Sequence, residues 1–348
     1  MKKQFIIIFI LMILGAAGTL FIILQSADLP NKENNGFDRR LIGEIVNPEV
    51  EKSLGEHITT ISGNTNTSLF LSGKSPQWVL KYDYNFNVLD TLVFGVSAGE
   101  DFVSPNTFVD SPNVYMYVVS YAYLLKGNFS TSVMDSVKLE SELITRMVQL
   151  SEDKLVIRSI DDSQTKQIFQ VIDAKSGRSI HKAQVVGAQQ YGGFDSDGIL
   201  KFDKSTNRLY FVQMFQNSIY CLDTALNLVY KNHTIDTTLT NKVIIDLVNE
   251  GGTTKVMATR PRSVVNKHVA VGNNNIYVIS GLRADNESLS EFIKYLSIDM
   301  YETSTGRYLG SKRLRKPVNK SVTDFKVLGD SWIILFDGGL CARYVIQS

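Results

Sequence analysis

The sequence predicts an all-β fold built from repeated strand-turn-strand units and preceded by one apolar helix. The first observation is a recurring phrase in which alternating apolar residues lead to an Asp and then to a short turn with Gly or Asn. Asp and Asn side chains cap turns and Gly accepts positive φ, so each phrase can close a hairpin. In the clearest copies the first strand ends at Asp83, Asp173, Asp223 and Asp299.

The second observation is a period of about 40 to 50 residues, which is typical of the blades of a β-propeller. Five blocks each hold about four expected strands, and a sixth block holds three. The blocks span residues 57–94, 102–140, 143–187, 197–236, 264–316 and 321–348. We therefore expect a propeller of six blades. Seven blades are the alternative if the irregular segment 237–263 contains a blade of its own.

The second block is centred on a Tyr-rich alternation from Val114 to Leu125. Tyr115, Tyr117, Tyr121 and Tyr123 lie two residues apart within pairs, which predicts an aromatic stripe on one side of a strand. Bulky residues of this kind pack between adjacent blades, and the same residues can form a platform for a carbohydrate or a peptide. Packing between blades is the favoured interpretation.

The last block lacks a fourth strand, because it offers only Val322–Leu328, Trp332–Phe336 and Leu340–Ile346. The spare strand Leu41–Val46 precedes the first block and can supply the missing strand of the last block. This pairing of the two ends of the domain would close the ring and remove an exposed sheet edge. We therefore expect residues 41–46 to pair with the last block.

The third observation is an uncharged apolar run from Phe5 to Leu24 that follows Lys2 and Lys3. About 20 apolar residues suffice to cross a membrane as a helix, and Gln25-Ser26-Ala27 makes a poor cleavage site. We expect residues 1–27 to be an uncleaved signal anchor in the inner membrane, residues 28–40 a flexible stalk and residues 41–348 the propeller. The basic start predicts that the propeller lies on the extracytoplasmic, periplasmic side.

The pattern of repeated blocks resembles the six-bladed β-propellers of the TolB-like superfamily, which are exported or membrane-tethered bacterial proteins. The resemblance covers residues 41–348 and depends on the period, the turns and the spare end strand. It implies a fold and no particular activity, since members range from scaffolds to lactone hydrolases.

The net charge and the cysteine content limit what the chain is expected to do. The chain carries 36 basic and 35 acidic residues, so its charge gives no support to nucleic-acid binding. Its two cysteines, Cys221 and Cys341, lie in apolar alternating stretches of blades that are not neighbours. We expect buried free thiols, with a disulfide as the alternative.

Catalytic and metal-binding signals are weak. The four histidines, His57, His181, His233 and His268, fall in four different blocks without ligand spacing, so no metal site is predicted. Asp195 and Asp197 beside Gly192-Gly193 can be read as a polar turn or as ligands of a Ca²⁺ ion in a central channel, and the turn is favoured. No nucleophile elbow, phosphate loop or Cys-x-x-Cys is present, and no cofactor is predicted.

Two basic segments are the candidate interaction surface. Lys312, Arg313, Arg315 and Lys316 surround Leu314 in the densest charge run, which fits an anionic partner or the wet side of an outer strand. Arg260 and Arg262 end the segment 237–263, for which a short helix or hairpin is expected. The sequence favours a binding or scaffold module for a protein or small ligand. A propeller enzyme, either a metal-dependent hydrolase or a quinoprotein-like oxidoreductase, is the alternative.

Overall fold

The structure is a computed structural model of the chain. It describes residues 2–25, 34–75, 77–95, 105–119, 121–141, 143–161, 166–187, 191–240, 245–250, 253–258 and 263–346. The chain divides into two compact units, Met1–Asn35 and Gly36–Ser348. The second unit begins before the expected start at Leu41, because Phe37 and Arg39 are already buried in it.

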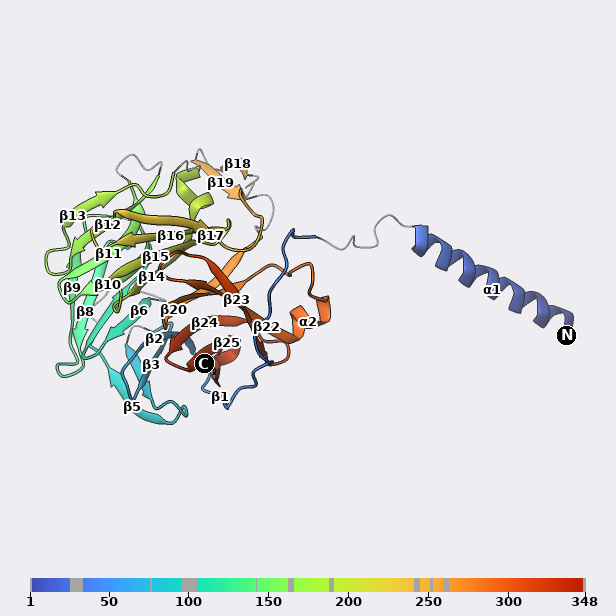
Figure 1. The fold of residues 1–348 in the computed structure, drawn as a ribbon, viewed down its shortest axis with the longest axis horizontal. Helices are drawn as coiled ribbons and strands as arrows, with labels where there is room; N and C mark the ends of the chain where they lie inside the picture. Colours follow the sequence, from blue (N-terminus) through green and yellow to red (C-terminus); the bar gives the residue numbers. More distant parts are fainter. Residues whose placement is uncertain are drawn as a thin grey trace. The chain divides into compact units, whose positions relative to one another are not determined.

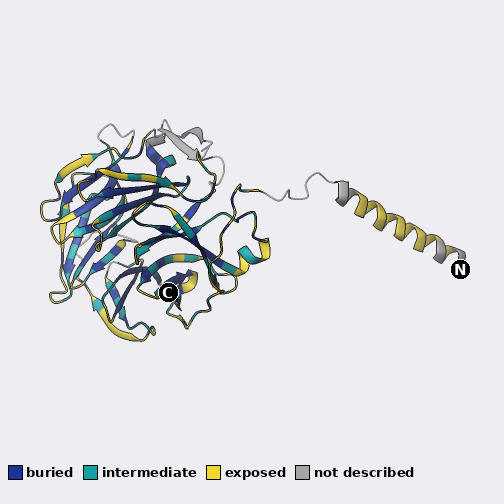
Figure 2. Cartoon of the chain, viewed as in Figure 1, coloured by how far each residue is buried: buried dark blue, intermediate teal, exposed yellow. Residues whose placement is uncertain are grey.

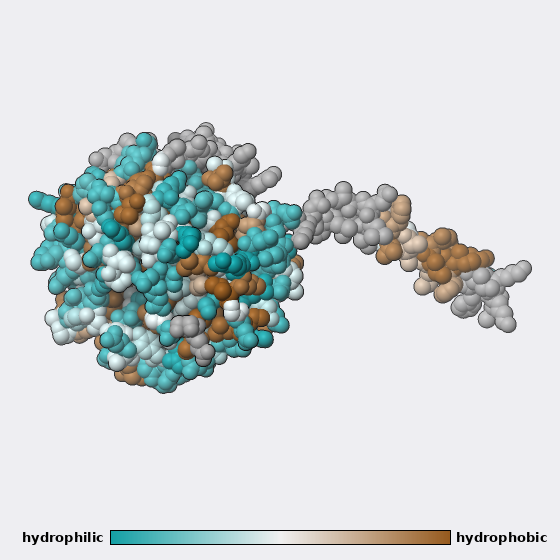
Figure 3. Space-filling model, viewed as in Figure 1, coloured by the Kyte–Doolittle hydropathy of each residue, from teal (hydrophilic) through white to brown (hydrophobic). Residues whose placement is uncertain are grey.

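The first unit contains α1 (Lys2–Gln25), and residues 7–21 of this helix are exposed. Figure 3 shows hydrophobic residues along the middle of α1, whereas hydrophilic residues cover most of the visible surface of the second unit. Among the described residues, no helix is both long enough and apolar enough to cross a membrane. The anchor expected over residues 5–24 stays a prediction.

The second unit consists of antiparallel sheets in which most strands pair with the next strand along the chain (Figure 1). Three sheets have four strands each in simple sequence order. The first contains β10 (Ile144–Ser151), β11 (Lys154–Ile160), β12 (Gln167–Asp173) and β13 (Ser179–Ala183). The second contains β14 (Gly198–Asp203), β15 (Arg208–Gln213), β16 (Ser218–Asp223) and β17 (Leu228–His233). The third contains β20 (Asn266–Gly272), β21 (Asn275–Ser280), β22 (Tyr295–Glu302) and β23 (Tyr308–Arg315).

The first two blocks of the sequence form one eight-stranded sheet made of two successive four-stranded meanders. The first meander contains β2 (Ile58–Asn64), β3 (Leu69–Gly73), β4 (Trp78–Tyr82) and β5 (Val88–Val93). The second contains β6 (Asn106–Asp110), β7 (Asn113–Tyr117), β8 (Tyr123–Asn128) and β9 (Met134–Lys138).

These meanders join where β2 and β6 run parallel, at the single pair of Gly63 with Val109. A Cβ atom on Gly63 would lie 2.3 Å from the Val109 carbonyl oxygen, so the approach requires glycine.

The expected closure of the ring occurs with a different strand. β1 (Val50–Ser53) pairs with β26 (Leu340–Val345), which completes a sheet with β25 (Ser331–Phe336) and β24 (Val322–Leu328). The prediction that residues 41–46 make this pairing is wrong. They run instead beside β23, with bridges from Leu41 to Ser311 and from Val46 to Leu314.

The reason for the difference is local. Gly43 has a φ of +72°, which interrupts the extended conformation that a regular strand would need. The N-terminal strap, residues 36–46, therefore touches β23 at separate points. Gly310 of β23 lies beneath it, and a Cβ there would approach the Ile42 side chain to 2.7 Å.

A buried ion network fixes the strap to the sheet of β20 to β23. The Arg39 side chain is 1% exposed and donates from Nε to Asp299 Oδ1 at 2.8 Å and from Nη1 to Glu287 Oε2 at 2.8 Å. Burial lowers the pKa of Arg39, but the Asp299 and Glu287 carboxylates more than offset this and raise it above its ordinary value. The guanidinium therefore stays charged inside the domain.

In each meander the second strand is more buried than the first strand and far more buried than the outermost one (Figure 2). β11, β15 and β25 are almost wholly buried, whereas β5 and β13 at the outer edges are mostly exposed. Apolar side chains of successive sheets form separate core clusters between them. An outermost strand is held mainly by backbone pairing and by a few packed side chains such as Met134 of β9, so its sequence needs little apolar pattern.

The predicted turn chemistry is confirmed in three of the four copies. Asp83 accepts hydrogen bonds from the Asn85 and Asn87 backbone, Asp173 from Lys175 and Ser176, and Asp223 from Ala225 and Asn227. The prediction for the fourth copy is wrong, because Asp299 lies inside β22 and accepts a hydrogen bond from Arg39. Its turn is made by Glu302, whose backbone oxygen accepts from Gly306 and whose carboxylate accepts from Thr305.

Two further expectations change in detail. The stretch from Val114 to Leu125 is divided between β7 and β8, so the four tyrosines do not form one stripe. Tyr115 and Tyr117 nevertheless pack in the core between sheets, as expected. A short helix, α2 (Leu289–Lys294), precedes β22 in a stretch assigned partly to a strand. Two 3₁₀ turns complete the fold, η1 (Tyr191–Ser196) and η2 (Asp337–Gly339).

The irregular segment 237–263 contains a hairpin, which is one of the two forms expected from the sequence. β18 (Ile245–Glu250) and β19 (Thr253–Ala258) make a two-stranded sheet. Its described residues thus form two strands and not the four of a further blade. The apolar residues Val243 and Ile244 lie outside the described residues.

Candidate ligand site in the central channel

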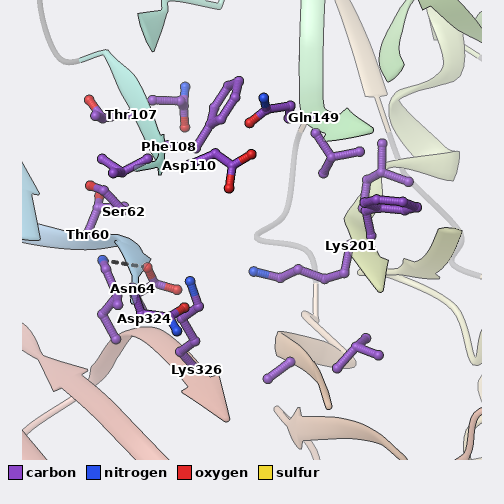
Figure 4. A pocket seen from close by; sticks show the side chains of 18 of the residues that line it. Thr60, Ser62, Asn64, Thr107, Phe108, Asp110, Gln149, Lys201, Asp324 and Lys326 are labelled. Carbon is purple, nitrogen blue, oxygen red and sulfur yellow. Dashed lines mark hydrogen bonds between the residues drawn. The ribbon is translucent and has the colours of Figure 1, made fainter. Parts of the chain in front are cut away.

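The first strands of the successive meanders surround a cavity of about 600 Å³. β2, β6, β10, β14, β20 and β24 all contribute lining residues, and Figure 4 shows their side chains converging on the open space. β14 lies beside β10 and β20, and β24 lies beside β20 and β2. The cavity is therefore a channel bounded by one strand from each four-stranded meander.

The period of a strand places charged residues in this channel. In β24, Phe325 and Val327 pack in the hydrophobic core, so the alternate positions Asp324 and Lys326 belong to the other face. β14 contributes Lys201, which extends from its strand into the open centre in Figure 4.

The carboxylates of the channel are already engaged. Asp324 Oδ2 accepts from the Ile61 backbone N–H at 2.8 Å, and its Oδ1 accepts from the Phe325 N–H at 2.8 Å. Asp110 pairs with Lys204, with 2.7 Å between Oδ1 and Nζ. Asp203 accepts from Ser205 and Thr206 in the turn that follows β14. These contacts direct the carboxylates to partners other than Lys201 and Lys326, although Asp324 and Asp110 still act on Lys326 at longer range.

The side chains of Lys201 and Lys326 make no ion pair or hydrogen bond within the described part of the chain. Burial, together with the positive charges of Lys201 and Lys204, lowers the pKa of Lys326 to about 8 against the opposing effect of Asp324 and Asp110. The channel thus carries two lysines that make no direct ion pair, and the pKa of one of them lies well below its ordinary value.

Uncharged polar groups complete the lining. Thr107 is only 5% exposed, and its buried Oγ1 has no hydrogen-bond partner among the described residues. Gln149 donates to the Tyr115 hydroxyl at 3.1 Å. Burial raises the pKa of Tyr117 to about 12, so its hydroxyl remains neutral. A buried hydroxyl without a partner is unusual in a folded protein.

The predicted basic surface divides between structural and exposed residues. Arg313 is held by Glu287 at 3.3 Å and by Glu291 at 2.9 Å, and its side chain is 11% exposed. Lys312 and Lys316 are half-buried, and Arg315 is exposed. Arg260 and Arg262 lie outside the described residues. Whether these positions bind a partner stays a prediction.

The carboxylates considered as metal ligands have another role. Asp197 pairs with Arg146 at 2.8 Å and with Arg158 at 3.2 Å, so two arginines neutralise it. The described residues hold no group of three or more His, Cys, Asp or Glu side chains that could bind a metal. His57, His181 and His233 are exposed, and His268 is half-buried near the channel.

The two cysteines agree with the sequence analysis. Cys221 and Cys341 are both free and buried. Burial raises the pKa of each thiol, which keeps it protonated and unreactive.

The charged pair in the channel was missed by the sequence analysis. Lys201 and Lys326 are charged residues within strands whose flanking positions are apolar, and each strand opens a block. This signal is visible in the sequence, because a charged residue in the first strand of a blade lies near the channel.

Comparisons with known proteins give likenesses at the level of fold. No family model matches the chain, and no curated protein matches it. A solved member of the DUF4221 family from Bacteroides vulgatus is 12% identical and has a TM-score of 0.55, with 90% of this chain and 99% of that chain covered.

Two further solved structures are propeller domains from fungi. The Pan2 WD40 domain of Neurospora crassa is 9% identical with a TM-score of 0.51, and the match covers 88% of this chain and 98% of that chain. The β-propeller domain of Cps50 (Swd1) from Myceliophteria thermophila is 9% identical with a TM-score of 0.50, covering 87% of this chain and 100% of that one. Identities this low show the fold alone, and the fold of this chain is an all-β propeller.

Proposed function

We propose that the protein is a binding module, a six-bladed propeller of the TolB-like type that takes a small polar ligand in its central channel. The observation that carries the proposal is the 600 Å³ cavity, which has the size typical of small-molecule sites. Its lining combines unpaired lysines with a buried hydroxyl that has no partner. Side chains of this kind recognise polar ligands, and a rigid ring of strands keeps them in place.

The count of six follows if the two meanders of the eight-stranded sheet are counted as separate blades. Within the described residues they meet only at the pair of Gly63 with Val109 and at an isolated bridge of Gly95 with Val133, whereas the strands within each meander pair over several residues. Together with the four four-stranded sheets this supports a six-bladed ring.

The proposal includes a membrane tether on the extracytoplasmic side. Its support is the uncharged sequence from Phe5 to Leu24 after two lysines, and the helix α1 that contains it. Expression in bacteria, followed by membrane fractionation and N-terminal sequencing, tests this part. The intact chain should be found in the membrane fraction, and a soluble product that starts near Asp28 would contradict the tether.

A blocked channel tests the binding function. Thr60 lines the cavity on β2, so Thr60→Trp should fill part of it, whereas Val88→Trp adds the same side chain to an exposed position on β5. Thermal shifts of the full chain are measured with a panel of anionic, neutral and cationic small molecules. We expect stabilisation of the unchanged chain and of Val88→Trp, and none of Thr60→Trp. Equal shifts for both variants would place the ligand outside the channel and refute the proposal.

A further inference from the structure

Two positively charged side chains in the channel have no direct ion-pair partner within the described part of the chain. Lys201 on β14 and Lys326 on β24 line the same cavity, and neither makes an ion pair within the described residues. Lys204 differs from them, because Asp110 binds it at the rim and its side chain is 60% exposed. Lysines usually avoid burial unless they are paired, so two unpaired lysines in one cavity need an explanation.

The neighbouring carboxylates act on these lysines only at longer range, because their direct contacts are with other groups. Asp324 is satisfied by two backbone N–H groups and Asp203 by its own turn. His268 on β20 lies near Asp324 and Lys201, and burial lowers its pKa, so it is neutral at and above neutral pH. The charged groups that act on Lys326 are thus Lys201 from β14, Lys204 from the turn after β14, Asp110 from β6 and Asp324 from β24.

Lysine chemistry indicates which ligand the channel suits. A Lys ammonium acts as a compact point charge with three donors, which binds carboxylate and phosphate groups. An anion in the channel would also relieve the repulsion between Lys201 and Lys326.

We infer that the channel binds a small molecule with a carboxylate or phosphate group, and that Lys201 and Lys326 hold this anionic group. The inference rests on the proposed function and names the class of ligand that the binding module takes. Binding energy comes from charge-assisted hydrogen bonds, and the cavity volume limits the ligand to a small molecule.

The test is calorimetric titration of the full chain in detergent with four probes: succinate, inorganic phosphate, ribose and putrescine. Succinate and phosphate separate the two sources of negative charge, while ribose and putrescine are the neutral and cationic controls. The variants Lys201→Met and Lys326→Met remove each ammonium and keep most of the side-chain stem. Lys138→Met is the matched control, because Lys138 is exposed on the outermost strand β9.

We expect at least one anionic probe to bind, and each channel variant to weaken it by about 10- to 100-fold, as expected for a lost hydrogen bond to a charged group. Lys138→Met should bind normally, and Lys326→Arg should retain part of the affinity. Lys326→Met should also melt at a higher temperature than the unchanged chain, because a half-buried charge without a partner is removed. This gain separates a ligand-binding lysine from one that supports the fold.

Each other outcome overturns a definite statement. Binding of ribose or putrescine without either anion refutes the inference and leaves the channel as a binding site. Unchanged anion affinity in both channel variants places the anion elsewhere and refutes the inference. Failure of all four probes to bind at millimolar concentration refutes the inference, while the wider panel tested with Thr60→Trp decides the proposed function separately.

Discussion

Removal of the Arg39 guanidinium should destabilise the propeller strongly, although Arg39 lies near the beginning of the domain. The side chain donates four hydrogen bonds, two to Asp299, one to Glu287 and one to the Leu282 carbonyl. Arg39→Met keeps the aliphatic stem and leaves two carboxylates buried without their cation. Breaking a buried ion pair in this way costs about 3–5 kcal/mol.

The remaining partners decide where in that range the loss falls. Glu287 keeps Arg313 and the Ser297 hydroxyl, and Asp299 keeps the Ser311 hydroxyl. We therefore expect a loss near the lower end, about 3 kcal/mol. This is a large part of the stability of a typical domain, which is about 5–15 kcal/mol.

Urea unfolding of the full chain, followed by tryptophan fluorescence, measures the change because Trp332 is buried in the last sheet. Arg40→Ala is the control, since Arg40 is exposed and its neighbour Arg39 is not. Asp299→Asn in the Arg39→Met background should restore part of the stability, because it removes one stranded charge. A loss below about 1 kcal/mol in Arg39→Met, equal to that of Arg40→Ala, would refute the role of the strap.

Two further predictions concern the core. Gly63→Ala should lower the unfolding free energy by about 1–3 kcal/mol, because its Cβ would meet the Val109 carbonyl at 2.3 Å, whereas Gly187→Ala, with open space around it, should change little. Equal melting temperatures for the two variants would contradict the close approach of β2 and β6. Cys221 and Cys341 should react with a thiol reagent only after unfolding, and rapid reaction of either in the native chain would show that its burial is incomplete.

Local chemistry explains why the blocks could be predicted from the sequence. Alternating apolar residues mark a strand between two sheets, and an Asp such as Asp83 or Asp173 marks the turn that follows. Both signals lie within a few residues, so their reading does not depend on the rest of the fold. The three strands of the last block and the need for a fourth were predicted for the same reason.

The identity of the closing strand could not be predicted in this way. Val50-Glu51-Lys52-Ser53 has no apolar alternation, because an outermost strand contributes its backbone and leaves its side chains in water. The more apolar residues 41–46 looked like the better strand, and Gly43 gave the only warning. The helix α2 had a clear local signal that was overlooked, since Ser288 and Glu291 form a capping box.

The candidate site depends on tertiary structure to a greater degree. Lys201 and Lys326 stand out as charged residues in the first strands of two blocks, so their approach to the channel could be predicted. The absence of direct ion pairs to these two lysines could not be predicted, because it depends on contacts between blades. For example, Asp324 accepts a hydrogen bond from the Ile61 N–H, which belongs to the first meander, at the place where the two ends of the domain meet.

The most direct test of the account is the pH dependence of succinate affinity, measured calorimetrically on the full chain between about pH 7 and 10. Succinate stays fully ionised over this range because carboxyl groups titrate far below it. The pKa of Lys326 is lowered to about 8 in the empty channel, and an anion binds its protonated form. Affinity should therefore be full below that pKa and fall as the pH rises through it, and the fall near pH 8 should be absent in Lys326→Met. A flat profile that is the same in both proteins would contradict an anion site at Lys326.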